Sequence, residues 1–159
     1  MTKAMTKLIQ ICALAVLSAG ASSYLAQAQT TATATATATA QKQVLLQADH
    51  SWNGVAYTQY PKGRPELTVL KLTIPPHTAL PWHRHPVPNA GYILSGQLTI
   101  QDRESGKSHT FHAGEAFAET VNDIHRGVSG DTPLVVLITY AGTPGVPTSI
   151  PVKGEKPEY

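Results

Sequence analysis

His83 and His85 stand two positions apart, and this pair constrains the fold of the chain more than any other feature. On a β-strand, side chains alternate between the two faces, so both imidazoles would point in the same direction. Neutral imidazoles on one face are suitable ligands for a divalent metal ion. A third histidine, His125, follows 42 residues after His83 in a second, hairpin-like segment. The three histidines therefore predict a metal pocket inside a small β-barrel.

The chain from residue 43 onward has the pattern of an all-β domain. Residues 67–74 alternate apolar and polar side chains, and residues 134–140 form a continuous apolar run that suits a central strand. Residues 44–46 are expected to open the domain, and no segment has a clear helical period. The other expected strands are separated by turns and span residues 91–94, 97–101, 109–112 and 116–119. Short strands with frequent turns indicate a barrel or a sandwich.

The surroundings of the first two histidines match most of a known motif. The first motif of the cupin family reads G-x5-H-x-H-x3,4-E-x6-G, and this chain has His83, His85 and Gly96 in register with it. The chain departs from the motif at two positions, where His77 replaces the first glycine and Asn89 replaces the glutamate. On these residues, the chain resembles the cupin superfamily, in particular its small single-domain, conserved-barrel (cupin type 2) members.

The second cupin motif reads G-x5-P-x-G-x2-H-x3-N, and Gly114 and His125 match it with the right spacing. Its proline, second glycine and asparagine are replaced by Thr120, Asn122 and Ser129. The resemblance covers residues 44–140 and implies an antiparallel double-sheet β-barrel of the cupin or jelly-roll type. It also implies one bound divalent metal ion (Fe, Mn, Ni, Co or Zn), held in the family by the residues that correspond to His83, His85, Asn89 and His125.

The sequence leaves the roles of Asn89 and Glu119 open. Asn89 could bind the metal, or it could cap the turn after residues 86–88. A neutral asparagine ligand leaves the ion with a double positive charge, which favours an anionic small-molecule ligand. Glu119 shares a strand face with Phe117, so we expect it inside the barrel with a raised pKa, as a general acid or base or as a metal ligand. The alternative is a solvated Glu119, or one paired with Arg126.

The predicted function follows from this site. The resemblance implies a metal-dependent small-molecule enzyme of the oxygenase, isomerase or lyase type, and Glu119 is its predicted catalytic residue. Two alternatives stay open: a non-catalytic barrel that binds or senses a small ligand or a metal, and a metal-free polar pocket. The sequence contains no Ser-His-Asp arrangement, no phosphate-binding glycine loop and no nucleotide fingerprint.

The first 28 residues have the features of a secretory signal peptide. Two lysines precede an apolar run over residues 8–19, and Ala26-Gln27-Ala28 has the small-x-small pattern of a cleavage site. The apolar run is too short for a comfortable membrane span. We therefore expect a periplasmic or secreted protein whose mature chain begins near Gln29 and lacks the single cysteine, Cys12.

Four parts are predicted along the chain: a signal peptide (1–28), a Thr/Ala-rich disordered linker (29–42), a barrel domain (43–141) and a Pro/Gly-rich C-terminal arm (142–159). Such an arm could cover a sheet edge in a homodimer. After position 28 the chain has as many acidic as basic residues, ten of each, so its net charge is zero. This composition gives no basic surface for nucleic acid.

Overall fold

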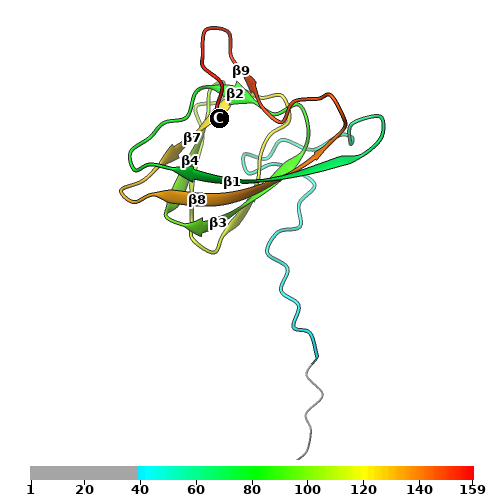
Figure 1. Ribbon diagram of the computed structural model, residues 1–159, viewed down its shortest axis with the longest axis horizontal. Helices are drawn as coiled ribbons and strands as arrows, with labels where there is room; N and C mark the ends of the chain where they lie inside the picture. The colour runs from blue at the N-terminus through cyan, green and yellow to red at the C-terminus, as the bar shows by residue number, and fades with distance from the viewer. Residues whose placement is uncertain (1–38) are drawn as a thin grey trace, which may run out of the picture. The chain divides into compact units, whose positions relative to one another are not determined.

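The computed structural model describes residues 39–159, of which residues 41–159 form one compact unit. The predicted signal peptide and most of the predicted linker lie outside the described residues. The part of the chain that is described contains no helix, and so none that could cross a membrane. Its two antiparallel sheets (Figure 1) are built from β1 (Glu66–Ile74), β2 (His83–Arg84), β3 (Asn89–Ser95), β4 (Gln97–Asp102), β5 (Ser108–His112), β6 (Ala116–Ala118), β7 (His125–Ser129), β8 (Leu134–Gly142) and β9 (Ile150–Pro151). The predicted all-β double-sheet fold is confirmed.

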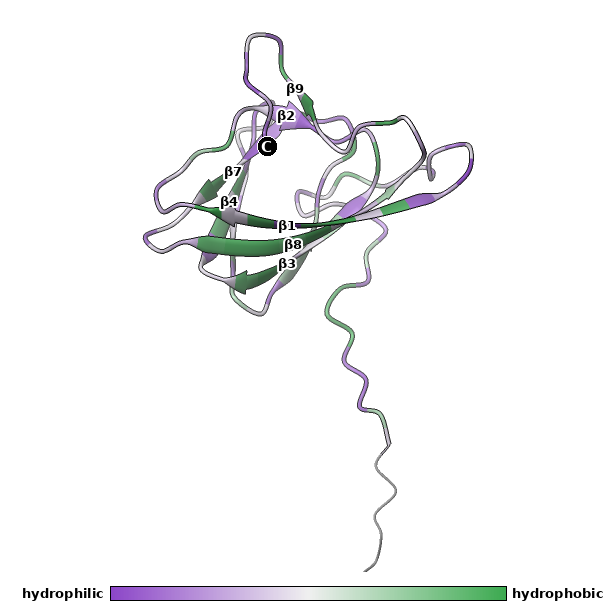
Figure 2. Ribbon diagram, in the orientation of Figure 1, coloured by the Kyte–Doolittle hydropathy of each residue, from purple (hydrophilic) through white to green (hydrophobic). Residues whose placement is uncertain are grey.

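The four-stranded sheet has the order β1-β8-β3-β6. β8 lies inside this sheet, as its apolar sequence predicts, and Figure 2 shows most of it as hydrophobic. Its β-branched and aromatic residues suit an extended strand. Every second side chain is buried toward the core, namely Leu134, Val136, Ile138 and Tyr140. β1 pairs with β8 along its whole length, from Glu66 opposite Gly142 to Ile74 opposite Leu134.

The five-stranded sheet has the order β5-β4-β7-β2-β9. Its strand β2 is only two residues long and hydrophilic (Figure 2), yet it pairs on both sides. On one side His83 lies opposite His125 of β7, and on the other side His83 and Arg84 lie opposite Pro151 and Ile150 of β9. This register brings two of the predicted ligands to neighbouring positions on paired strands.

Two glycines allow close approaches that shape the barrel. Gly96 has a φ of 77°, and a Cβ atom there would lie 2.5 Å from the carbonyl oxygen of Pro133, so the turn between β3 and β4 requires glycine. Gly91 has ordinary φ, but a Cβ atom there would lie 2.1 Å from the ring of Phe117. The missing side chain therefore lets Phe117 pack flat against β3 and holds β6, which precedes Glu119, close to the core.

One segment differs from its expected structure. Residues 44–46 form no strand, and their side chains are exposed. A strand needs a partner for its backbone N–H and C=O groups, and no strand of the described part pairs with this segment. The C-terminal arm, in contrast, is tied to the barrel, because its strand β9 extends the five-stranded sheet beside β2.

Candidate metal centre

The three predicted histidines converge inside the barrel. His83 and His125 lie opposite each other on β2 and β7, and His85 follows β2 by one residue. Their ring centroids are 4.8 to 5.0 Å apart, and one ligand nitrogen from each ring lies within 4.8 Å of the others. The three side chains are only 1–2% exposed. Two histidines at alternate positions do point to the same side, as predicted.

A backbone carbonyl oxygen fixes each imidazole ring. The Nδ1 atoms of the three rings lie at hydrogen-bond distance from the carbonyls of Pro81 (2.8 Å, His83), Thr148 (2.6 Å, His85) and Asp123 (3.0 Å, His125). A carbonyl can only accept, so each Nδ1 donates, and in the neutral ring Nε2 then carries the lone pair. Metal-binding histidines are commonly oriented by such bonds. The three rings are thus prepared to bind a metal through Nε2.

Glu119 points into the barrel toward the Nε2 atoms of His85 and His125. It follows β6 directly, and its side chain is 8% exposed. One carboxylate oxygen lies 3.0 Å from His85 Nε2, and the other lies 3.5 Å from His125 Nε2. The hydroxyl of Tyr57 donates to the Glu119 backbone carbonyl at 2.6 Å, which fixes this segment. The interior position expected for Glu119 therefore agrees with the structure.

The direction of the Glu119 pKa shift corrects the sequence prediction. Burial raises the pKa of this carboxyl, but the neighbouring imidazoles of His85 and His125 outweigh burial. The pKa is lowered well below its usual value of 4.5. The predicted raised pKa is wrong because partner groups, rather than the apolar walls, decide the shift. Burial, with the neighbouring His85 and His125, lowers the pKa of His83 to about 4, so His83 is neutral at pH 7.

Glu158, near the C-terminus, is a second carboxylate at the centre. One of its oxygens lies 3.3 Å from His83 Nε2, and its side chain is 4% exposed. Burial, its largest influence, raises the pKa of this carboxyl, and the nearby Glu119 raises it further. The sequence does not predict a place for Glu158 at the centre, because neither motif nor strand pattern connects residue 158 to the histidines. The only signal was its place in an arm long enough to return to the barrel.

The three histidines could hold one metal ion. Ligand atoms about 2.1 Å from a common ion and about 90–110° apart lie about 3.0–3.4 Å from each other. The three carboxylate–imidazole distances, 3.0, 3.3 and 3.5 Å, are close to that spacing. Three atoms at the centre, Glu119 Oε2, Glu158 Oε2 and His125 Nε2, have no hydrogen-bond partner within residues 39–159. Buried lone pairs that face one another need a cation between them, and imidazole with carboxylate suits a transition metal.

The sequence matches the family model described as the cupin domain over residues 70–140. This match covers the two sheets' central strands and all three histidines. Residues 70–140 form a cupin domain. No match was found among curated proteins.

Several solved structures resemble this cupin. The DMSP lyase DddQ from Ruegeria pomeroyi DSS-3 is 19% identical, with a TM-score of 0.48 over 54% of this chain and 43% of the lyase. The polyketide cyclase RemF from Streptomyces resistomycificus is 20% identical, with a TM-score of 0.47 over 54% of this chain and 60% of the cyclase. An RmlC-like cupin from Shewanella frigidimarina NCIMB 400 is 19% identical, with a TM-score of 0.44 over 50% of this chain and 69% of that protein. The chain thus spans less than half of the lyase.

Asn89, the main departure of this cupin from the first motif, is buried at the start of β3. It lies opposite Tyr140 of β8, whose ring is 5.3 Å from that of His85. Neither polar atom of the Asn89 amide has a hydrogen-bond partner in residues 39–159, so this side chain caps no turn there. The turn-cap alternative is therefore wrong, and the amide stays a predicted ligand beside the centre.

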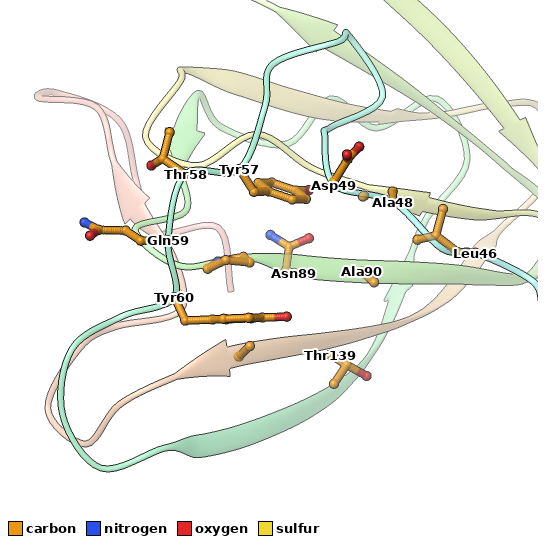
Figure 3. Close-up of a pocket in the computed structure, with 13 residues that line it drawn as sticks. Leu46, Ala48, Asp49, Tyr57, Thr58, Gln59, Tyr60, Asn89, Ala90 and Thr139 are labelled. Carbon is orange, nitrogen blue, oxygen red and sulfur yellow. The ribbon is translucent and has the colours of Figure 1, made fainter.

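A pocket of about 620 Å³ lies between the segment that precedes β1 and the start of β3. Figure 3 shows Asn89 between Tyr57 and Tyr60 of the segment that precedes β1. None of the three histidines lines this pocket, and neither Glu119 nor Glu158 does. Tyr57, which lines the pocket, also donates the hydrogen bond to the Glu119 backbone carbonyl.

The remaining candidates have supporting roles. Arg126 does not pair with Glu119, because its Nε donates to Gln101 at 2.8 Å and its guanidinium lies 4.5 Å from the ring centroid of Trp82. This cation–π contact supports the outer side of the strand that carries His83. The other histidines of the domain are exposed and do not belong to the histidine cluster: His50, His77, His109 and His112.

Proposed function

We propose that this cupin binds one divalent metal ion through His83, His85, His125 and Glu119. The observation that carries the proposal is the convergence of the three histidines, each ring held by its Nδ1 hydrogen bond. The Nε2 atoms of His85 and His125 also face the buried carboxylate of Glu119. Glu119 supplies the negative charge that Asn89 lacks at the family's glutamate position. Ligand type leaves the metal open among Fe, Mn, Ni, Co and Zn.

We further propose that the chain is a small-molecule enzyme of the oxygenase, isomerase or lyase type, exported to the periplasm or beyond. A bound metal would supply a Lewis acid for a substrate oxygen or a bound water. The ligand and catalytic roles of Glu119 are alternatives for one carboxylate, and its two short distances to Nε2 atoms support the ligand role. Tyr140 could then hold a proton beside His85, because burial raises its pKa and keeps the hydroxyl protonated.

A non-catalytic binding or sensing cupin is the second candidate. The observation that favours it is the closure of the centre, where the histidines are 1–2% exposed and the arm carrying Glu158 lies over His83. A substrate would need the arm to move before it could reach the metal. A homodimer stays a prediction, and the exposed Leu67 and Val69 of the edge strand β1 are the surface we would test for it by light scattering.

The test is metal content measured by mass spectrometry on the exported protein. We expect about one equivalent of metal in the wild type and a loss of that metal in the His83→Ala/His85→Ala double variant. His112→Ala, which removes an exposed histidine of β5, is the matched control and should retain the metal. A wild-type protein that stays free of metal after reconstitution, with unchanged thermal stability, would contradict the proposal. Metal-dependent turnover in a panel of small oxygen-rich substrates then separates enzyme from binding protein.

A further inference from the structure

The C-terminal arm is attached to the strand that carries the histidines. β9 pairs with β2, and the Val152 N–H donates to the carbonyl of Trp82 at 2.9 Å. The carbonyl of Thr148 orients the His85 ring, and the Thr148 hydroxyl lies 2.7 Å from the hydroxyl of Tyr159. Figure 1 shows the C-terminus beside β2. The arm is thus held at both of its ends, at the place where the ligands meet.

Glu158 is the buried exception in an exposed segment. Residues 153–157 are exposed, whereas the Glu158 side chain is only 4% exposed. Glutamate is almost never fully buried unless it is paired. The groups that face it satisfy a carboxylate only in part, because His83 Nε2 carries a lone pair and Glu119 is a second carboxylate, while Ser149 offers one neutral hydrogen bond. A cation at the centre removes this conflict.

We propose that Glu158 is itself a ligand of the metal, so that the arm completes the centre. This inference rests on the metal binding proposed above. Three imidazoles and two carboxylates then surround the ion, and the two negative charges balance its double positive charge. Glu158 then takes the position at which the sequence led us to expect an anionic small molecule. An external anion would have to displace Glu158.

The experiment compares Glu158→Gln with Glu155→Gln, an exposed glutamate on the same arm. Apo protein of each variant is titrated with Co²⁺, and the affinity and the visible absorption spectrum of the bound ion are recorded. We expect Glu158→Gln to weaken Co²⁺ binding about tenfold or more and to change the spectrum, because a charged ligand is lost. Glu155→Gln should behave as the wild type. Thermal unfolding of the apo proteins shows that each variant is folded.

Glu158→Asp separates direct binding from long-range attraction, because it retains the charge but shortens the side chain. We expect an altered spectrum. A wild-type spectrum and affinity in Glu158→Gln would overturn the inference, and so would a wild-type spectrum in Glu158→Asp combined with a change in affinity alone in Glu158→Gln. If the wild type itself does not bind Co²⁺, the proposed metal binding is overturned together with the role of Glu158. If the wild type binds Co²⁺ and only the variant results fail, the role of Glu158 alone is overturned.

Discussion

The histidines and the carboxylates of the centre are held in different ways. His83 and His125 lie on paired strands, and a backbone carbonyl fixes the ring of each histidine. Glu119 follows β6 directly and Glu158 lies well past the end of β9, both outside any strand, and their oxygens face the imidazoles of the centre. The nitrogen half of the site is therefore preorganised, whereas the carboxylate half depends on charge.

This difference indicates that the histidines set the affinity for the metal, whereas the carboxylates can be exchanged. Rings oriented by backbone hydrogen bonds lose little freedom when a metal binds, so they contribute most of the binding free energy. Carboxylates held mainly by charge can exchange for a substrate group or a water molecule. The following predictions test this contrast, from the largest expected effect to the smallest.

His125→Ala should have the largest effect. It removes a preorganised ligand, and we expect metal affinity to fall by more than about a hundredfold, beyond the loss that follows removal of a supporting partner. Isothermal titration of the apo protein with Zn²⁺ measures the change, with His112→Ala as the control. A loss of less than about tenfold would show that the three imidazoles do not act as one site.

Glu119→Gln should have a smaller effect on the same measurement. Glutamine has the size of glutamate but no charge, and we expect affinity to fall about ten- to a hundredfold. Glu66→Gln, at the exposed start of β1, is the control. A loss as large as that of His125→Ala would contradict the contrast between the two halves.

Gly91→Ala tests the packing that positions Glu119. The added methyl group would clash with Phe117, so we expect the free energy of unfolding to fall by about 1–3 kcal/mol. Urea unfolding followed by circular dichroism measures the effect. Gly142→Ala is the matched control, because a Cβ atom there would meet its nearest neighbour at 3.6 Å. Equal stability of the two variants would mean that Phe117 shifts without strain.

Tyr57→Phe should have the smallest effect, about 1 kcal/mol at pH 7, because it removes one hydrogen bond to the Glu119 backbone. Burial, with the charge of Glu119, raises the pKa of Tyr57 to about 12. The unfolded chain ionises near pH 10, so the Tyr57 contribution is fully present below pH 10 and is lost toward pH 12.

The stability difference between wild type and Tyr57→Phe should therefore shrink as the pH rises from 10 to 12. Urea unfolding over this range measures it, with Tyr60→Phe, at an exposed tyrosine, as the control. A difference that stays constant with pH would show that Tyr57 titrates like a solvated tyrosine.

Much of the fold was predictable because its signals are local. Alternation along residues 67–74 and the apolar run of residues 134–140 predict β1 and β8, and both strands form. Residues 44–46 show the limit of such signals, because an apolar run becomes a strand only where a partner strand is available. Glu119 lies inside the barrel, as the face that it shares with Phe117 predicted, but the alternation itself ends there, because Ala118 and Thr120 are also buried.

The sequence alone determined the histidine half of the centre. The spacing of His83 and His85 sets their common direction through the geometry of an extended chain, and the distance to His125 matches a known motif. Only the tertiary structure decided the carboxylate half. The lowered pKa of Glu119 depends on His85 and His125, which approach it across the barrel. Glu158 reaches His83 from 75 residues away, because the arm returns along β9 to β2. Local alternation governs which way a side chain points, but only the packed chain determines which charges meet.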